Sequence, residues 1–326
     1  MDGLDLIDRR LLDEFQRGFP LCRRPFAALG DALDLAESDV LFRLERLRAQ
    51  GMVSRVGATV RPNVAGASTL AAMAVPEARI EDAAALVGAE PGVNHSYQRE
   101  DDWNLWFVMA AANAAALEMG LVRIEKATGL RVLDLRLMRP FNIDLGFSLR
   151  GKRAAMAGDR PATSLELDDR DRALLAVLSR EGLRLVPEPF APLAQALGLA
   201  EDQLLARLET FQTAGVITRM GVIVRHRPLG WTANAMVVWD LPEDSIPAAG
   251  RALAQVPGVT LCYQRRTVPD IWPFGLYSMI HGRSRAEALG VLAQARALPE
   301  LAGSVSKPLF STRCFKQTGA LILEAA

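Results

Sequence analysis

The chain contains two imperfect copies of one sequence unit, and this repeat constrains its fold more than any other feature. Residues 91–99 read Pro-Gly-Val-Asn-His-Ser-Tyr-Gln-Arg, and residues 257–265 read Pro-Gly-Val-Thr-Leu-Cys-Tyr-Gln-Arg. The match begins near the start of each copy, where residues 8–12 align with residues 171–175. A repeat of this kind predicts that both halves of the 326-residue chain fold into the same elements.

Each copy begins with three segments whose apolar residues recur at helical spacing. In the first copy these segments cover residues 7–17, 25–33 and 37–49, and a strand-like stretch then leads to Arg61. The second copy repeats the pattern, and its strand-like stretch leads to Arg225. Three short helices followed by a β-wing are typical of a winged helix-turn-helix domain.

The apolar spacing then changes, and it predicts the order βαββαβ in each copy. In copy one the segments are 68–75, 80–87, 93–99, 104–110, 114–128 and 132–139, and in copy two they are 233–240, 245–255, 259–265, 274–281, 284–297 and 304–310. This order is typical of a ferredoxin-like sheet with helices on one face. The sequence therefore predicts an α+β tandem duplicate. Its expected parts are winged helix-turn-helix domains at 1–62 and 165–228, ferredoxin-like domains at 63–150 and 229–326, and a linker at 151–164.

The copies differ at two positions that carry histidine. His95 aligns with Leu261, whereas His281 aligns with Ala110. The chain has three histidines, and we expect the third, His226, to be exposed at the end of the wing. Two histidines at one repeated locus, one from each copy, indicate a shared site to which each half supplies a different imidazole.

The helices of a ferredoxin-like sheet cover one face, so the other face must be buried against a partner, and the sister copy is the attached candidate. Because side chains alternate along a strand, His95, Tyr97 and Arg99 should share one face. A cavity between the two sheets would be lined by His95, His281, Tyr97, Tyr263, Trp106 and Tyr277, with Arg99, Arg265 and Arg266 at its edges.

That lining suits a flat macrocycle that carries carboxylates. Aromatic rings stack on such a ligand, arginines bind carboxylates through two hydrogen bonds, and a histidine can ligate iron or deliver a proton. Simpler roles stay open for each residue type. The aromatic residues suit core packing, the arginines suit surface ion pairs, and a histidine on a strand often has only a structural role.

Charge and composition limit the class of partner. The 38 basic residues balance the 38 acidic ones, whereas nucleic-acid binders usually carry a basic excess. The helices expected to read DNA, 37–49 and 201–213, also begin with acidic residues, which would repel phosphate. We therefore expect no DNA partner.

The remaining composition concerns location. The three cysteines form no CxxC pair, which predicts a reducing compartment and no structural zinc. The first residues have no signal-like apolar core, and no apolar run approaches the roughly 18 residues that a membrane span needs. We therefore expect a cytoplasmic protein with no membrane contact.

The motifs resemble those of a known family. A winged helix followed by a βαββαβ sheet resembles the leucine-responsive regulators of bacteria over nearly all of each copy. More specifically, residues 92–99 and 104–107 resemble one type of siroheme decarboxylase subunit. Residues 262–265, 272–274 and 277–282 resemble the other type, so the order is similar to a natural fusion of the two.

The resemblance implies a carboxy-lyase that removes the C12 and C18 acetate carboxyls of siroheme, giving 12,18-didecarboxysiroheme in haem d1 or alternative haem biosynthesis. It places the functional histidines at His95 and His281, either as proton donors or with one as a ligand of the substrate iron. It implies no organic cofactor, because the iron tetrapyrrole is itself the substrate. One departure is Gly275, where the family tends to have asparagine, as Asn104 does in copy one.

The partners expected from this resemblance are siroheme, the sister copy as an intramolecular pseudo-dimer or a second chain in a homo-oligomer, and other enzymes of the haem d1 pathway. Two alternatives stay open. One is a tetrapyrrole- or haem-responsive transcription regulator that binds DNA, and the other is a chaperone that binds the tetrapyrrole without chemistry.

Overall fold

A computed structural model of the chain describes residues 4–142 and 165–319, in two compact units. Unit 1 comprises Met1–Ala65 and Gly146–Gly230, and unit 2 comprises Gly66–Leu145 and Trp231–Ala326. Each unit therefore combines the corresponding parts of both copies. The linker predicted at 151–164 lies outside the described residues.

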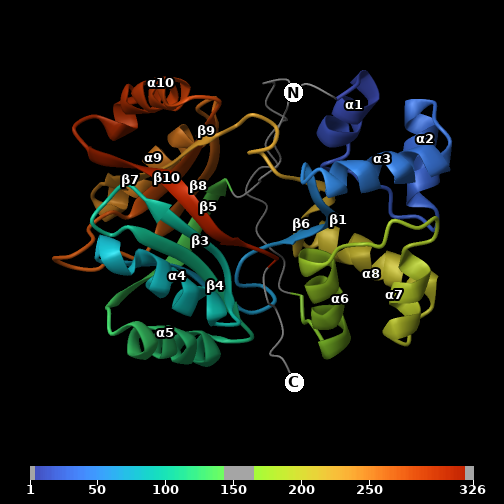
Figure 1. The fold of residues 1–326 in the computed structure, drawn as a ribbon, viewed down its shortest axis with the longest axis horizontal. Coiled ribbons are helices and arrows are strands. Elements are labelled where there is room, and N and C mark those ends of the chain that lie inside the picture. The colour runs from blue at the N-terminus through green and yellow to red at the C-terminus, as the bar shows by residue number, and fades with distance from the viewer. Residues whose placement is uncertain (1–3, 143–164, 320–326) are drawn as a thin grey trace. The chain divides into compact units, whose positions relative to one another are not determined.

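Unit 1 contains the helices expected for two helix-turn-helix regions (Figure 1). They are α1 (Leu6–Glu14), α2 (Pro25–Leu33) and α3 (Glu37–Ala49) in copy one, and α6 (Asp169–Arg180), α7 (Phe190–Ala196) and α8 (Glu201–Thr213) in copy two. The first helix of each copy starts the same way. The carboxylates of Asp5 and Asp168 each accept a hydrogen bond from the backbone N–H three residues on. The carboxylates of Asp8 and Asp171 accept one in turn from the backbone N–H of Asp5 and Asp168. Such reciprocal capping fixes both helix starts.

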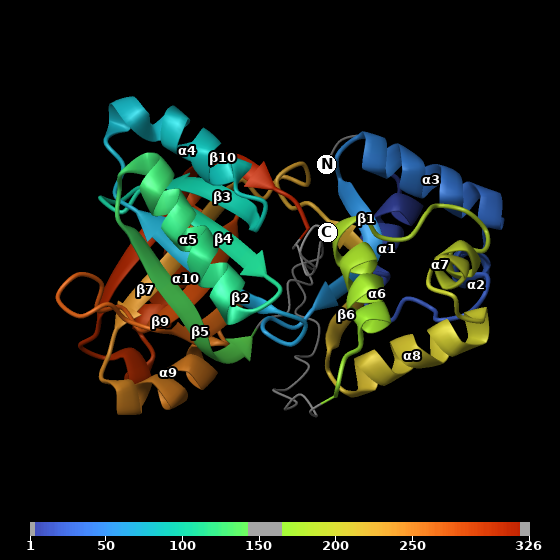
Figure 2. The same ribbon diagram turned by 90° about the horizontal axis from the view of Figure 1, so that it is seen from below.

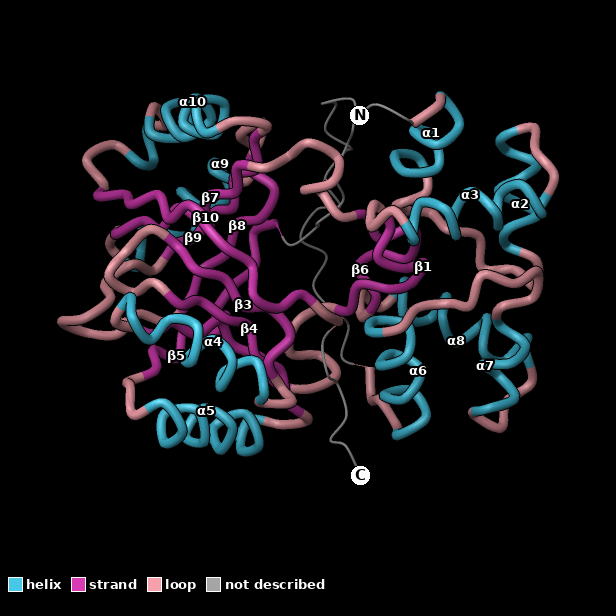
Figure 3. Tube along the Cα trace, in the orientation of Figure 1, coloured by secondary structure: helices cyan, strands magenta, loops and turns pink. Residues whose placement is uncertain are grey.

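The strands predicted as wings form, but each pairs with the equivalent strand of the other copy. β1 (Val53–Val60) and β6 (Ile217–Val224) make an antiparallel two-stranded ribbon (Figure 3). Two equivalent glycines lie where this ribbon packs against the opposite copy. A Cβ on Gly57 would collide with the Leu178 carbonyl of copy two, and a Cβ on Gly221 with the Phe15 carbonyl of copy one. The ribbon thus lies tightly against the end of a helix from the opposite copy.

Unit 2 contains both βαββαβ units, which confirms the predicted fold class. Copy one supplies β2 (Ala67–Met73), α4 (Ile80–Ala89), β3 (Val93–Arg99), β4 (Leu105–Ala111), α5 (Ala114–Thr128) and β5 (Val132–Asn142). Copy two supplies β7 (Ala233–Asp240), α9 (Ile246–Leu253), β8 (Val259–Arg265), β9 (Leu276–Gly282), α10 (Arg285–Arg296) and β10 (Val305–Gln317). Short 3₁₀ turns lie at Glu77–Arg79, Glu243–Ser245 and Pro299–Leu301.

The two sheets close into one barrel with the strand order β10-β3-β4-β2-β5-β8-β9-β7. Closure depends on two pairings between the copies, β5 with β8 and β10 with β3. Helices α4 and α5 cover the outside of the copy-one strands, and α9 and α10 cover the outside of the copy-two strands (Figures 1 and 2). The face predicted to be buried against the sister copy is therefore the barrel interior.

Two apolar clusters lie in the core of unit 2. One lies between the copy-one strands and their helices and includes Phe107, Met109 and Leu117. The other fills the barrel with residues of both copies, among them Trp106 and Tyr277. Throughout the part of the chain that the structure describes, every helix is too short or too polar to cross a membrane.

Candidate active site at one end of the barrel

Both predicted histidines lie toward the same end of the barrel. Neighbouring strands are antiparallel around the ring, so strands four places apart, such as β3 and β8, run in the same direction. Equivalent residues of the two copies therefore lie at the same end. His95 is near the start of β3, and His281 is near the end of β9, beside the start of β8. We call the end where β3 and β8 begin the histidine end.

His95 points into the barrel. It lies opposite Val108 of β4, which packs on the interior cluster. Its ring stacks on that of Tyr97, with centroids 6.3 Å apart and an interplanar angle of 25°. The Nδ1 atom of His95 is 2.6 Å from the Oδ1 atom of Asn94. The predicted shared face of His95 and Tyr97 is confirmed.

His281 reaches the same interior from copy two. It follows Met279, a member of the interior cluster, by two residues and pairs with Asn234 of β7. Only 7% of His281 is exposed, and its Nδ1 atom is 2.8 Å from Thr260 Oγ1. Asn234 is buried as well, and its Oδ1 atom has no hydrogen-bond partner among the described residues.

The inward-facing side chains are less completely buried at the histidine end. His95, Tyr97, Val108 and Leu261 all belong to the inward-facing rows, yet each is only half-buried. A protein interior normally covers such apolar and aromatic side chains completely. Side chains at the histidine end are therefore partly exposed, whereas the aromatic rings farther along the strands are buried.

Aromatic residues close the other end, where β3 and β8 finish. Trp106 and Tyr277 are almost fully buried, and Trp272 of the loop before β9 packs between them. Trp272 lies 5.3 Å from Trp106 between ring centroids, and its Nε1 donates to the Tyr277 hydroxyl at 2.7 Å. Burial raises the pKa of Tyr277 above its usual range. We call this the tryptophan end.

Sequence reasoning missed the role of Trp272. The signal was a difference in length, since nine residues separate Arg265 from Gly275 in copy two and only four separate Arg99 from Asn104 in copy one. The additional residues carry the indole into the barrel.

The arginines of the two copies have equivalent partners across the barrel seams. Arg99 Nη1 donates to the Leu309 carbonyl at 3.0 Å, and Arg265 Nη1 donates to the Leu135 carbonyl at 2.8 Å. The guanidinium carbons lie 5.6 Å from the Tyr97 ring centroid and 4.5 Å from the Tyr263 ring centroid, respectively. Each arginine thus joins its own strand to the other copy and supports a tyrosine.

Arg266 lies apart from this set. Its exposed side chain donates to the backbone carbonyl of Asp134 at 2.8 Å and to that residue's carboxylate at 2.9 Å. Tyr263, by contrast, belongs to the interior cluster and stacks on Tyr277 with centroids 6.1 Å apart. The structure therefore gathers the predicted aromatic residues and histidines in one interior, and Arg266 is exposed beside Asp134.

The structure also bears on the expectations for Gly275 and His226. The Asn104 amide hydrogen-bonds both the N–H and the carbonyl of Val75, so asparagine has a backbone-bridging role here in copy one. At Gly275 a Cβ would approach Ile246 Cδ1 to 2.8 Å, which leaves little room for a larger residue. His226, expected to be exposed, is half-buried, and burial together with Arg227 lowers its pKa to about 4.

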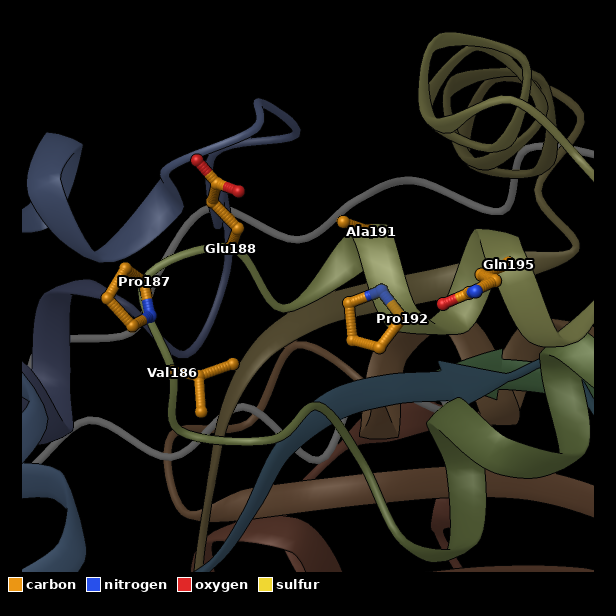
Figure 4. A pocket seen from close by; sticks show the side chains of 6 residues that line it. All are labelled: Val186, Pro187, Glu188, Ala191, Pro192 and Gln195. Atoms are coloured by element: carbon orange, nitrogen blue, oxygen red, sulfur yellow. The ribbon is translucent and has the colours of Figure 1, made fainter.

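Unit 1 also has a shallow, open hollow (Figure 4). It is lined by Val186, Pro187, Glu188, Ala191, Pro192 and Gln195, around the start of α7. None of the predicted site residues contributes to it. Its few polar groups provide no chemistry comparable to that of the histidine end.

Comparison with known proteins agrees with this architecture. Residues 65–142 and 228–316 match the AsnC-like ligand binding domain, and residues 8–53 and 171–217 match the siroheme decarboxylase NirDL-like HTH domain. The whole chain is 62% identical to the siroheme decarboxylase NirDL subunit of Paracoccus pantotrophus, over 99% of that protein. The chain belongs to the siroheme decarboxylase family. The enzyme class predicted from its motifs, carboxy-lyase, is thereby confirmed.

Solved structures of the family have the same fold. A siroheme decarboxylase NirDL superposes with a TM-score of 0.71 and 28% identity, covering 96% of this chain and 93% of the other. A NirDL structure in complex with an iron-uroporphyrin III analogue has a TM-score of 0.69 and 27% identity, covering 96% and 92% of the two chains.

The family also includes proteins of half the length. The siroheme decarboxylase NirD subunit of Stutzerimonas stutzeri is 47% identical over 45% of this chain and 96% of its own length. One copy of the repeat thus corresponds to a separate protein elsewhere in the family.

Proposed function

We propose that this protein removes the carboxyl groups of the C12 and C18 acetate side chains of siroheme, giving 12,18-didecarboxysiroheme for haem d1 biosynthesis. The observation that carries the proposal is the histidine end, where one barrel interior receives an imidazole from each copy. The iron-uroporphyrin analogue bound by a family member supports an iron tetrapyrrole as the ligand.

The chemistry requires one proton for each carboxyl group. The bond between the acetate methylene and the carboxylate carbon breaks, CO2 leaves, and the electron pair stays on the methylene carbon or passes into the conjugated ring. Protonation then converts the side chain into a methyl group. A histidine near its pKa is suited to supply that proton at neutral pH, and general acid catalysis is worth about 10²–10⁴ in rate.

The proposed roles follow the positions of the residues. His95 and His281 act as proton donors, or one of them ligates the substrate iron. The substrate-binding set that we propose is Tyr97, Arg99, Trp106, Tyr263, Arg265, Arg266 and Tyr277. Half-buried Tyr97 beside His95 suits direct contact with the macrocycle, whereas buried Trp106 and Tyr277 support the site from within the interior cluster.

Anaerobic incubation of the purified protein with siroheme, followed by mass spectrometry, tests the activity. We expect loss of two CO2 per molecule. An unchanged siroheme mass would contradict the proposal, and tight binding without a mass change would support a tetrapyrrole chaperone instead.

Single histidine variants test the site. His95→Ala and His281→Ala should each lower kcat by about 10²–10⁴ while circular dichroism stays native. His226→Ala is the matched control, because His226 lies in unit 1, and it should keep full activity. Normal turnover by both barrel variants would show that the site is assigned to the wrong residues.

A further inference from the structure

The same position of the repeat holds a β-bulge in both copies, and each bulge lies beside one of the two barrel histidines. The register between β3 and β4 shifts between Val93 and His95, and the register between β8 and β9 shifts between Val259 and Leu261. The extra residue is Asn94 in copy one and its equivalent in copy two, Thr260. A bulge removes a residue from the regular ladder and changes the direction of its side chain, so such positions recur beside active sites.

Each bulge residue contacts the Nδ1 atom of a histidine. Asn94 Oδ1 is 2.6 Å from the Nδ1 atom of His95, its neighbour in sequence. Thr260 Oγ1 is 2.8 Å from the Nδ1 atom of His281, which lies on the adjacent strand. The two histidines occupy different positions of the repeat, yet the same bulge position reaches both.

The hydrogen-bond donors and acceptors at these contacts fix the tautomer. The amide oxygen of Asn94 has no hydrogen to donate, so the Nδ1 atom of His95 must be the donor. Thr260 Oγ1 lies 3.1 Å from the Met279 carbonyl, which can only accept, so the hydroxyl satisfies both neighbours when it donates to Met279 and accepts from the Nδ1 atom of His281. In both imidazoles Nδ1 therefore carries the fixed hydrogen, and Nε2 is the atom that gains and loses a proton.

We propose that Asn94 and Thr260 are positioning residues that hold His95 and His281 as Nδ1–H tautomers, with Nε2 as the proton-delivering atom. This assignment depends on the proposed function of the histidines as proton donors. An oxygen acceptor at Nδ1 also holds the imidazole in one orientation, so that Nε2 keeps a fixed direction.

Nitrogen NMR of the imidazoles tests the tautomers without any turnover. The chain has three histidines, so ¹⁵N-histidine labelling gives three ring systems, which single His→Gln variants assign. At a pH above histidine titration, the substrate-free protein should show Nδ1 protonated in His95 and His281. Protonated Nε2 in both rings would overturn the proposal.

Matched variants then test function. Thr260→Val keeps the side-chain shape but removes the acceptor. It should release the His281 tautomer and lower kcat about ten- to a hundredfold with little change in KM. Thr260→Ser restores the hydroxyl and should restore both the tautomer and kcat. In copy one, Asn94→Leu and Asn94→Asp form the equivalent pair for His95.

The outcomes separate this inference from the proposed function. If siroheme is not decarboxylated by the wild type while the NMR spectrum shows the Nδ1–H tautomers, the proposed function fails and the tautomer assignment stands. If the wild type is active and Thr260→Val keeps its kcat and its His281 tautomer, the positioning role is wrong. Melting curves for each variant exclude unfolding as the cause of a loss.

Discussion

At the scale of single residues, the hydrogen bond between Trp272 and Tyr277 distinguishes packing from ligand binding. Tyr277→Phe would leave the buried indole N–H of Trp272 without its acceptor at 2.7 Å. We expect a loss of about 1–3 kcal/mol in the free energy of unfolding, measured by urea titration. Tyr97→Phe, at a half-buried position, should cost less.

The same pair of variants has a kinetic readout. If Tyr277 acts mainly through the interior cluster, its variant should lose more stability than siroheme affinity. A Tyr277→Phe variant of full stability with a strongly raised KM would instead place the phenol in direct contact with the substrate.

Residue positions on strands could be predicted from the sequence, and residues in loops could not. The two-residue period of a strand was enough to place His95 and Tyr97 on one inward face. Trp272 lies in an irregular segment without any period, so nothing local indicated that its side chain enters the barrel. The contacts at the bulges were likewise hidden, because a bulge breaks the alternation on which the prediction rests.

At the scale of elements, charge pairing on the helix-turn-helix regions predicts that DNA binding is weak. Arg43 and Arg46 of α3 both bind the buried carboxylate of Asp8, and Arg207 of α8 binds Asp171. These cations are therefore neutralised within the protein. Because DNA affinity depends on cations that replace phosphate counterions, gel shifts should show no retarded band at low or moderate salt.

A charge-altered variant provides the control for that measurement. Glu201 and Asp202 in the first turn of α8 lie next to Arg23, and their replacement by lysine would make the start of the helix basic. This variant should acquire weak, salt-sensitive binding. A salt-sensitive complex with the wild type would revive the regulator hypothesis.

His226, in the segment after β6, predicts a pH dependence of stability. Burial and the Arg227 charge lower its pKa from 6.5 to about 4 in the folded protein. Between these values the unfolded chain binds the proton and the folded chain does not, so the stabilisation is present above pH 6.5 and lost as the pH falls to about 4. Urea midpoints of the wild type should fall across this window.

His226→Gln isolates the effect from the carboxylates, which titrate in both proteins. The difference in urea midpoint between the wild type and His226→Gln should change between pH 6.5 and 4 and stay constant above pH 7. Parallel curves across the whole range would mean that His226 titrates normally in the folded state.

Element bounds followed closely from the sequence, but element partners did not. The predicted bounds of α2, α3 and β8 coincide with those of the structure, because helical period and strand alternation are local properties. The partner of β1 is set by non-local packing, where Gly57 lets the strand approach a helix of the other copy. The sequence therefore predicted a wing within each copy, whereas in the structure the two strands pair with each other across the copies.

At the scale of the molecule, duplication explains both the barrel and its asymmetry. The repeat predicted that two uncovered faces meet, and the structure closes them through the seams β5–β8 and β10–β3. Edge pairing of this kind has no sequence signature, because any sheet edge offers the same backbone groups. Within the closed ring, each copy lacks the histidine that the other carries.

Division of the chain between its copies tests whether the barrel requires both. Residues 1–150 contain His95 but not His281, and residues 165–326 contain the reverse. Each half alone has the unpaired edges of an open sheet and one of the two imidazoles, so we expect self-association or aggregation and no didecarboxylated product. The mixed halves should form a 1:1 complex that regains siroheme turnover, as measured by light scattering and mass spectrometry. The separate half-length subunits of the family support this expectation. Complete decarboxylation by one half alone would show that the histidine of a single copy suffices, and the proposal of a site shared between the copies would then be wrong.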